Sequence, residues 1–203
     1  ASEGNGLTVI NSKEWLSHRG SVGQAKIGKV RICGEDGEEL PNGETGLIYF
    51  SDSPKFEYHN DPQKTKDSRN QYGWSTLGDI GYLDSGDYLY LTDRKANTII
   101  SGGVNIYPQE IENHLLGHPA VKDVAVIGAP NKEFGEEVKA VVLPSQKFFE
   151  RDDLEKELIE FCLLRVGKIK SPKSVDFVEK LPRQENGKLY KRLLKDHYWK
   201  KGR

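Results

Sequence analysis

Four short stretches of the chain carry side chains suited to binding a nucleotide or moving charge. Ser2 and Glu3 place a hydroxyl beside a carboxylate, Asp79 lies in "WSTLGDIGY", Arg94 begins "RKANTIISGGVNIYP", and Lys188 lies in "LPRQENGKLYKR". A carboxylate can accept two sugar hydroxyls, and a guanidinium can hold a phosphate or a ribose with its planar fork. A lysine at the tip of a turn can neutralise the charge that develops on a phosphate.

Each of these residues also has an ordinary explanation when it is taken alone. Glu3 would be a solvated loop acid, and Asp79 would be a turn residue that accepts from nearby backbone N–H groups. Arg94 would be a surface charge, and Lys188 would belong to a solvated turn. It is their order and spacing along one chain that favours a shared chemical role.

The paired glycines Gly102 and Gly103 stand between a β-branched run and a helix that Pro108 would open. A lone glycine in a strand usually marks a bulge. Two in succession before a proline-opened helix favour another interpretation, a backbone along which a ligand slides, because glycine places no side chain in its way.

The elements that must position these residues fall into two parts. Residues 1–93 are predicted to be β-rich, because 28–50 has the pattern strand, turn, strand and 73–94 repeats that plan. Residues 58–71, which are rich in Pro, Lys and Asp, are predicted to form an exposed loop.

Residues 94–203 are predicted to be α+β. A helix begins at Pro108 and ends at Gly117, with Ile111 and Leu115 on its apolar face. The other expected elements are strands over 121–130, 136–144 and 174–181, a helix over 152–166 capped by Asp152, and a basic helix through Leu189, Leu193 and Leu194.

Composition limits the classes of function. The 203 residues suffice for one large or two small domains, and 30 Lys and Arg against 31 Asp and Glu give a net charge of −1. That balance offers no general attraction to nucleic acid or to an anionic membrane. Two distant cysteines, Cys33 and Cys162, fit no metal or redox spacing and favour a reducing, cytoplasmic setting.

Targeting signals are not predicted either. No apolar run is long enough for a transmembrane segment, and the opening "ASEGNG" resembles neither a signal peptide nor a transit peptide. Because the chain has no Met and opens on a polar, Gly-rich loop, we expect a piece of a longer or engineered protein.

The stretch 73–144, followed by "LPRQENGKLYKR", resembles the adenylate-forming enzymes, which include acyl-CoA synthetases, luciferases and the adenylation domains of peptide synthetases. The resemblance runs from the first residue to about Lys195, and "DRKANTIISGGVNIYPQEIE" is most similar to the fatty or aryl acid–CoA ligases. It implies that a small-molecule carboxylic acid reacts with ATP to give an acyl-adenylate and pyrophosphate. A small, mobile C-terminal α+β domain then swings on a hinge, and the CoA thiol attacks the adenylate.

The resemblance also implies a role for each candidate residue. Glu3 would bind Mg²⁺, with Ser2 beside it at the ATP site, Asp79 would bind the ATP ribose, and Arg94 would lie near the ribose and the α-phosphate. Lys188 would be the catalytic lysine of adenylation. The remaining residues would bind CoA or form the hinge: Gly102 and Gly103 in the pantetheine tunnel, Phe134 on the CoA adenine, Lys170 and Lys173 at its phosphates, and Ala96 at the hinge.

Three positions depart from the family's pattern. Ala96 stands where Asp or Lys is usual, so a polar latch is gone, although alanine can absorb a hinge rotation. Asn186 replaces a common threonine, and Ser171 stands where some relatives carry an arginine for a CoA phosphate. The phosphate loop and the acyl pocket lie upstream in the family and are not in this chain. We therefore expect its partner to be the missing N-terminal part of the same enzyme, and these residues alone to be inactive.

Two other functions stay open. An acyl-AMP ligase or a peptide-synthetase adenylation domain would hand the acyl group to a carrier protein, although "SGGVNIYP", Phe134 and the basic "KIKSPK" favour CoA. A stand-alone binding module for nucleotide or CoA would need no upstream part. The sequence does not identify the acid, because it does not contain the acyl pocket.

Overall fold

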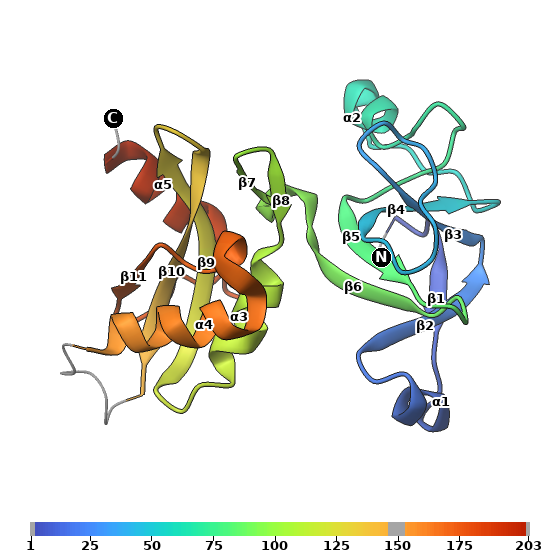
Figure 1. Ribbon diagram of the computed structural model, residues 1–203. Coiled ribbons are helices and arrows are strands. Elements are labelled where there is room, and N and C mark those ends of the chain that lie inside the picture. The colour runs from blue at the N-terminus through green and yellow to red at the C-terminus, as the bar shows by residue number, and fades with distance from the viewer. Residues whose placement is uncertain (1–2, 146–152, 202–203) are drawn as a thin grey trace. The chain divides into compact units, whose positions relative to one another are not determined.

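The computed structural model describes residues 3–145 and 153–201 (Figure 1). The fold is α+β, and the chain divides into two compact units, Ala1–Ala96 and Asn97–Arg203. Arg94 is the last residue of a strand in the first unit, which therefore extends past the predicted limit at residue 93. That the two predicted parts, 1–93 and 94–203, act as separate functional domains stays a prediction.

Across its described residues, 3–96, the first unit is an antiparallel sheet of six strands in the order β1-β2-β6-β5-β4-β3, with two short α-helices. Its elements are β1 (Leu7–Val9), α1 (Ser12–Ser17), β2 (Ser21–Ile27), β3 (Lys29–Cys33), β4 (Gly46–Ser51), α2 (Pro62–Asp67), β5 (Asp79–Leu83) and β6 (Leu89–Arg94). Ile32, Ile48, Leu83 and Leu89 form its buried core. This core fixes β5 and β6, whose ends carry two of the candidate site residues.

Helix α2 corrects the prediction of a loop over 58–71. The Asp61 side chain accepts a hydrogen bond from the Lys64 backbone N–H at 2.9 Å, and Pro62 occupies the start of the helix. These are the two local features that begin a helix. A helix of six residues has no apolar period, so the sequence pattern did not reveal it.

The sheet of the second unit is built around β10 (Gly135–Pro144). This strand pairs along one edge with β9 (Val121–Asn131). Its other edge pairs first with β7 (Ile99–Ser101) and further along with β11 (Ser174–Phe177), while β8 (Val104–Ile106) continues the sheet beyond β7. The hairpin of β7 and β8 is therefore attached to the sheet at the start of β10.

Helices cover both faces of this sheet (Figure 1). Val124 and Val126 of β9 pack with α3 (Pro108–Leu116) and α4 (Leu154–Lys170). Ala125, between them, faces the opposite way and packs with α5 (Lys191–Lys201), as expected because successive strand residues point to opposite faces. The sheet thereby holds α5, and the turn before it, in a fixed relation to the β7–β8 hairpin.

Element limits were predicted well where local signals are strong. Helix α3 begins at Pro108 and has Gly117 as its C-cap, which confirms the predicted limits. Asp152 lies outside the described residues, and the residue immediately before α4 is Asp153. Helix α4 extends beyond residue 166, although it breaks at Gly167, where φ is 75° and ψ is 172°.

Two predicted elements near the end are shorter than expected. Strand β11 ends at Phe177 rather than at residue 181. Helix α5 begins at Lys191, because Leu189 forms an isolated antiparallel bridge with Arg183 and belongs to the preceding turn. In the described part of the chain, no helix is long and apolar enough to cross a membrane.

Candidate functional site

Two of the predicted nucleotide-binding residues meet in the first unit. Asp79 opens β5, Arg94 closes β6, and the antiparallel register places them opposite each other. The Arg94 Nε atom lies 2.6 Å from Asp79 Oδ1. The two side chains are 55% and 31% exposed, respectively, so a ligand can still reach both.

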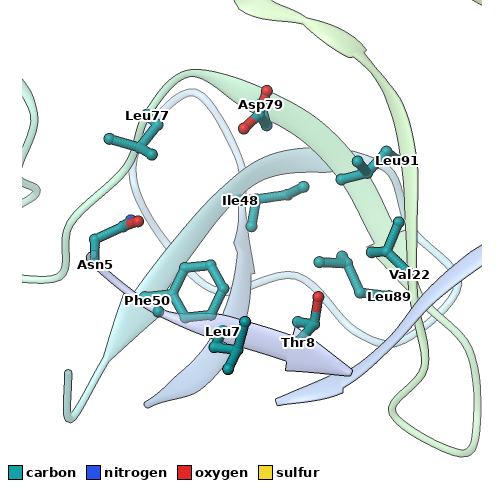
Figure 2. A pocket seen from close by; sticks show the side chains of 11 residues that line it. Asn5, Leu7, Thr8, Val22, Ile48, Phe50, Leu77, Asp79, Leu89 and Leu91 are labelled. Carbon is teal, nitrogen blue, oxygen red and sulfur yellow. The ribbon is translucent and has the colours of Figure 1, made fainter. Parts of the chain in front are cut away.

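A groove of about 310 Å³ lies beside Asp79 in the same unit (Figure 2). Its side chains are mostly apolar: Leu7, Val22, Ile48, Phe50, Leu77, Leu89 and Leu91. Figure 2 shows Asp79 at one end of this lining and Leu7 and Thr8 at the other. An apolar groove with one carboxylate at its edge can cover an apolar surface while the carboxylate accepts hydroxyl groups.

Glu3 lies against Tyr58. Burial raises the pKa of Tyr58, and the charge of Glu3 and its hydrogen bond with the Tyr58 hydroxyl raise that pKa further. Ser2, which was predicted at the ATP site, lies outside the described residues.

The Mg²⁺ assignment rests on this Glu3 carboxylate. Among residues 3–145 and 153–201, no three His, Cys, Asp or Glu side chains gather as a metal site. Protein sites for Mg²⁺ often supply only one or two carboxylates and leave the other positions to water and substrate phosphates. A single carboxylate at Glu3 therefore fits an ion that is carried largely by a bound nucleotide.

The paired glycines form the turn of the β7–β8 hairpin. Ser101 pairs with Val104, which leaves Gly102 and Gly103 as a two-residue loop. Their φ values are 57° and 81°, and a type I′ turn requires positive φ at both positions. The pair is therefore a hairpin turn and not a bulge, and the turn alone is sufficient reason for two glycines. The passage of a ligand along them stays a prediction.

Phe134 lies directly beside this turn. The Gly102 N–H donates to the Phe134 carbonyl at 3.0 Å. A Cβ at Gly102 would lie 3.1 Å from Phe134 Cδ1, whereas a Cβ at Gly103 would have nothing within 4 Å. The Phe134 side chain is 49% exposed. The structure thus brings three of the predicted CoA residues together as an open backbone edge beside an accessible aromatic ring.

The two lysines predicted at CoA phosphates have protein partners in this state. The Lys170 Nζ atom lies 2.7 Å from Glu110 Oε2 in the first turn of α3. The Lys173 Nζ atom donates to the Lys168 carbonyl at 2.8 Å. Either lysine would have to exchange a partner for a phosphate, so their assignment to CoA stays a prediction.

Lys188 lies at the end of a tight turn over residues 184–188. Hydrogen bonds of 2.8 Å run from Gln184 N–H to the Lys188 carbonyl and from Gly187 N–H to the Gln184 carbonyl. The φ of Gly187 is 81°, and the Lys188 N–H donates to Asn186 Oδ1 at 3.0 Å. Asn186, which replaces the common threonine, therefore fixes this turn, and Lys188 is presented exposed to solvent.

A buried ion pair, which no sequence motif predicted, anchors the helix that follows this turn. The Lys191 Nζ atom lies 2.8 Å from Glu112 Oε1, with the two side chains 13% and 5% exposed. Glu112 Oε1 also accepts from the Val126 N–H at 2.6 Å. Because Glu112 lies next to Ile111 on the buried stripe of α3, the helical period could have indicated a buried carboxylate in need of a partner.

The hinge candidate Ala96 lies in a 3₁₀ turn, Lys95–Asn97, at the end of the first unit. The Lys95 N–H donates to the Gly78 carbonyl at 2.8 Å, and this hydrogen bond attaches Lys95 to the loop that precedes Asp79. Ala96 itself is exposed. This hydrogen bond does not involve the backbone of Ala96. Rotation at Ala96 stays a prediction.

The cysteines take no part in these sites. Burial raises the pKa of Cys33 and Cys162 to about 11, and Cys33 is affected further by the nearby carboxylates of Glu39 and Glu38. Both thiols are fully buried. Neither has the lowered pKa and accessibility of a reactive thiolate.

The chain is similar to known proteins in sequence and in fold. Residues 110–188 match the family described as the AMP-binding enzyme C-terminal domain. Over 194 residues the chain is 39% identical to the long-chain-fatty-acid–CoA ligase FadD13 of Mycobacterium tuberculosis, a match covering 95% of this chain and 38% of the relative. Over 174 residues it is 36% identical to the fatty acid–[acyl-carrier-protein] ligase ScoC of Streptomyces coeruleorubidus, covering 84% of this chain and 32% of the relative.

The fold is also shared with a solved relative. The crystal structure of ATP-bound MatB from Rhodopseudomonas palustris superposes with a TM-score of 0.77 and 36% identity, covering 88% of this chain and 36% of that protein. The chain thus spans little more than a third of the length of the relatives it matches. Residues 110–188 thus belong to the family of AMP-binding enzyme C-terminal domains, and the chain as a whole is similar to about a third of the length of adenylate-forming ligases.

Proposed function

We propose that this chain supplies the C-terminal part of an acid–CoA ligase, which converts a carboxylic acid and ATP to an acyl-adenylate and then transfers the acyl group to CoA. One observation carries the proposal: the second unit presents both an exposed lysine on a rigid turn and an open glycine hairpin beside an exposed aromatic ring. The first arrangement suits adenylation and the second suits thioester formation.

In adenylation, Asp79 accepts hydroxyl groups of the ATP ribose, and Arg94 holds Asp79 in place while its remaining N–H groups face the phosphates. The ion pair at 2.6 Å and its exposure support these roles. Lys188 places a compact positive charge at the α-phosphate as the acid attacks. Mg²⁺ bound with the nucleotide would supply further charge neutralisation, and Glu3 is the carboxylate that would hold it.

In thioester formation, the hairpin turn at Gly102 and Gly103 borders the path of the pantetheine arm. The absence of any atom within 4 Å of a Cβ at Gly103 supports an open edge at this position. Phe134, half exposed beside the turn, offers a face on which the CoA adenine can stack. Lys170 and Lys173 would then exchange Glu110 and the Lys168 carbonyl for CoA phosphates.

The partner of this chain is the rest of the same enzyme, which would contribute the phosphate loop and the acyl pocket. The relatives are more than twice as long as the matched region, which supports such a part. Leu7 and Leu91, which line the groove beside Asp79, are 47% and 53% exposed. Apolar side chains of this size around a groove suit coverage by another part of the protein. A cytoplasmic location fits the buried, unreactive cysteines.

A carrier protein is the second candidate acceptor, because one of the relatives is a ligase for an acyl carrier protein. The exposed Phe134 beside the glycine turn favours CoA, since it offers a stacking face for an adenine. A carrier protein would require a docking surface instead.

The test uses the full-length enzyme, which would contain this chain together with the phosphate loop and the acyl pocket. Acid-dependent ATP–pyrophosphate exchange should appear with at least one member of a panel of fatty and aryl acids, and free CoA should discharge the adenylate. Discharge only by a phosphopantetheinylated carrier protein would select the second candidate. Absence of exchange with every acid would contradict the proposed function.

A further inference from the structure

The turn that carries Lys188 is tied to the sheet by Arg183. The Arg183 Nη1 atom donates to the Gly187 carbonyl at 2.7 Å, and its Nη2 atom pairs with Asp123 Oδ2. The other Asp123 oxygen, Oδ1, accepts from the Val124 N–H at 2.9 Å. One guanidinium thus joins the peptide that immediately precedes Lys188 to strand β9.

The base and the apex of this turn are held differently. At the base, the Tyr190 N–H donates to the Pro182 carbonyl at 2.9 Å, and Leu181 and Leu189 pack against the core beneath α5. At the apex, in the described part of the chain, the hydrogen bonds of residues 185–187 stay within the turn except the one from Arg183. The position of the apex relative to the sheet therefore depends on Arg183.

The chemistry of this tie requires an arginine. A planar guanidinium offers several N–H groups in a fixed fork, so it can bond a carbonyl and a carboxylate at once, whereas an ammonium is a single point of charge on a flexible stem. The Arg183 side chain is 45% exposed and that of Asp123 is 26% exposed. Exposed pairs of this kind contribute little to the free energy of unfolding, so a stabilising effect alone does not explain the pairing of Arg183 with Asp123.

We propose that Arg183, held by Asp123, is a positioning residue for Lys188 in adenylation. The inference rests on the proposed function, in which the Lys188 ammonium meets the α-phosphate. A preorganised charge is effective only where it is held at the developing negative charge, and a misplacement of about 1 Å can slow a reaction on the order of a hundred-fold. Without the contacts of Arg183, the Lys188 side chain would remain, but its ammonium group would not be held at the α-phosphate.

The experiment compares Arg183→Lys and Asp123→Asn in the full-length enzyme with the matched control Arg192→Lys. Arg192 lies on α5, is 79% exposed and pairs with Asp196 one turn away, so the control makes the same chemical change away from the Lys188 turn. Single-turnover adenylation should slow about ten-fold in Arg183→Lys and less in Asp123→Asn, as expected for a misplaced rather than missing charge. The KM for ATP, the urea midpoint and the attack of CoA on a supplied acyl-adenylate should stay at their control values.

The double variant Arg183→Lys/Lys188→Ala separates positioning from direct contact. It should adenylate no more slowly than Lys188→Ala alone, because Arg183 acts through Lys188. A double variant slower than Lys188→Ala, a raised KM for ATP, or an Arg183→Lys enzyme as fast as the control would overturn the inference. If Lys188→Ala itself adenylates at the wild-type rate, the proposed function fails as well, and the two failures are thereby distinguished.

Discussion

Arg94 reaches across from the end of β6 to the start of β5, where its Nε atom lies 2.6 Å from Asp79 Oδ1. The register of two neighbouring strands creates this contact, so the two residues are held together before any ligand binds. One oxygen of Asp79 thereby has a fixed cationic partner, and the other can turn toward hydroxyl groups. The pair is partly exposed, so it contributes little to the free energy of unfolding.

Removing the charge of Asp79 should weaken nucleotide binding without unfolding the protein. In the full-length enzyme, Asp79→Asn should raise the Kd for ATP about ten-fold, since hydrogen bonds to a charged group contribute roughly 1.5–3 kcal/mol. Calorimetric titration measures the Kd. The matched control is Asp52→Asn, whose partner Lys29 forms an equally simple ion pair with both side chains 66% exposed. Equal effects of the two substitutions on the Kd would refute the role of Asp79.

The 203-residue chain alone should release no pyrophosphate above background when it is given ATP, Mg²⁺ and fatty or aryl acids. The chain supplies Glu3, Asp79, Arg94 and Lys188 for adenylation. The phosphate loop and the acyl pocket, which adenylation also requires, would belong to the upstream part of the enzyme. A coupled pyrophosphate assay, with the longer protein as the positive control, measures this. Robust release by the short chain would show that the upstream part is dispensable.

Trypsin should first cut the chain at Arg94 or Lys95 and leave a stable piece that begins near Ala96. Arg94, Lys95 and Ala96 are all exposed, and the two compact units meet after Ala96. Junctions of this kind are crossed by few contacts and are accessible to proteases. Mass spectrometry of a time course identifies the first products. Early cuts within 110–165, with Lys95 protected, would place the boundary elsewhere.

Breaking the buried ion pair of Glu112 and Lys191 should destabilise the second unit strongly. Lys191→Met removes the cation that lies 2.8 Å from the buried Glu112 carboxylate, and breaking a buried pair in this way costs about 3–5 kcal/mol. The double variant Glu112→Gln/Lys191→Met should recover part of that loss, because the glutamine amide oxygen can still accept from the Val126 N–H.

Urea unfolding of the 203-residue chain measures these differences, with Trp199 as the probe of the second unit after Trp15 and Trp74 are replaced by Phe. The control is Arg192→Met, which breaks a pair whose side chains are 79% and 54% exposed and should cost less than about 1 kcal/mol. A Lys191→Met variant as stable as this control would show that the pair does not anchor α5.

The sequence predicts local features better than distant contacts. Pro108 and Gly117 mark both limits of α3, because the signals that start and stop a helix lie within a few residues. Glycines at 102 and 103 predicted an unusual backbone but not the hairpin, which depends on the pairing of Ser101 with Val104. Helix α2 was missed because its cap, Asp61, lies in a uniformly polar stretch.

The candidate site shows the same division. Asp79, Arg94 and Lys188 could be named from short motifs, whereas the residues that hold them could not. Arg183 meets Asp123 from 60 positions away and Lys191 meets Glu112 from 79 positions away. These residues meet only because the turn and α5 pack on the sheet, so the pattern of charges in the sequence does not predict which residues form ion pairs.

In the proposed function, one domain serves two half-reactions through different residues, Lys188 for adenylation and the Gly103 turn for thioester formation. Gly103→Leu tests the role of the turn, but a leucine is strained at the Gly103 φ of 81°. The control is Gly20→Leu, which introduces the same kind of strain at a φ of 89°; an added Cβ meets nothing within 4 Å at either position. Urea unfolding of each full-length variant must first show a cooperative transition, which establishes that the variant is folded.

Single-turnover rates of both half-reactions in Lys188→Ala and Gly103→Leu are the most direct measurement. Lys188→Ala should slow adenylation on the order of a hundred-fold or more and leave CoA attack on a supplied acyl-adenylate nearly unchanged. Gly103→Leu should slow CoA attack and spare adenylation, and Gly20→Leu should affect neither. Equal slowing of the same half-reaction by Lys188→Ala and Gly103→Leu would contradict the separate roles of Lys188 and the Gly103 turn.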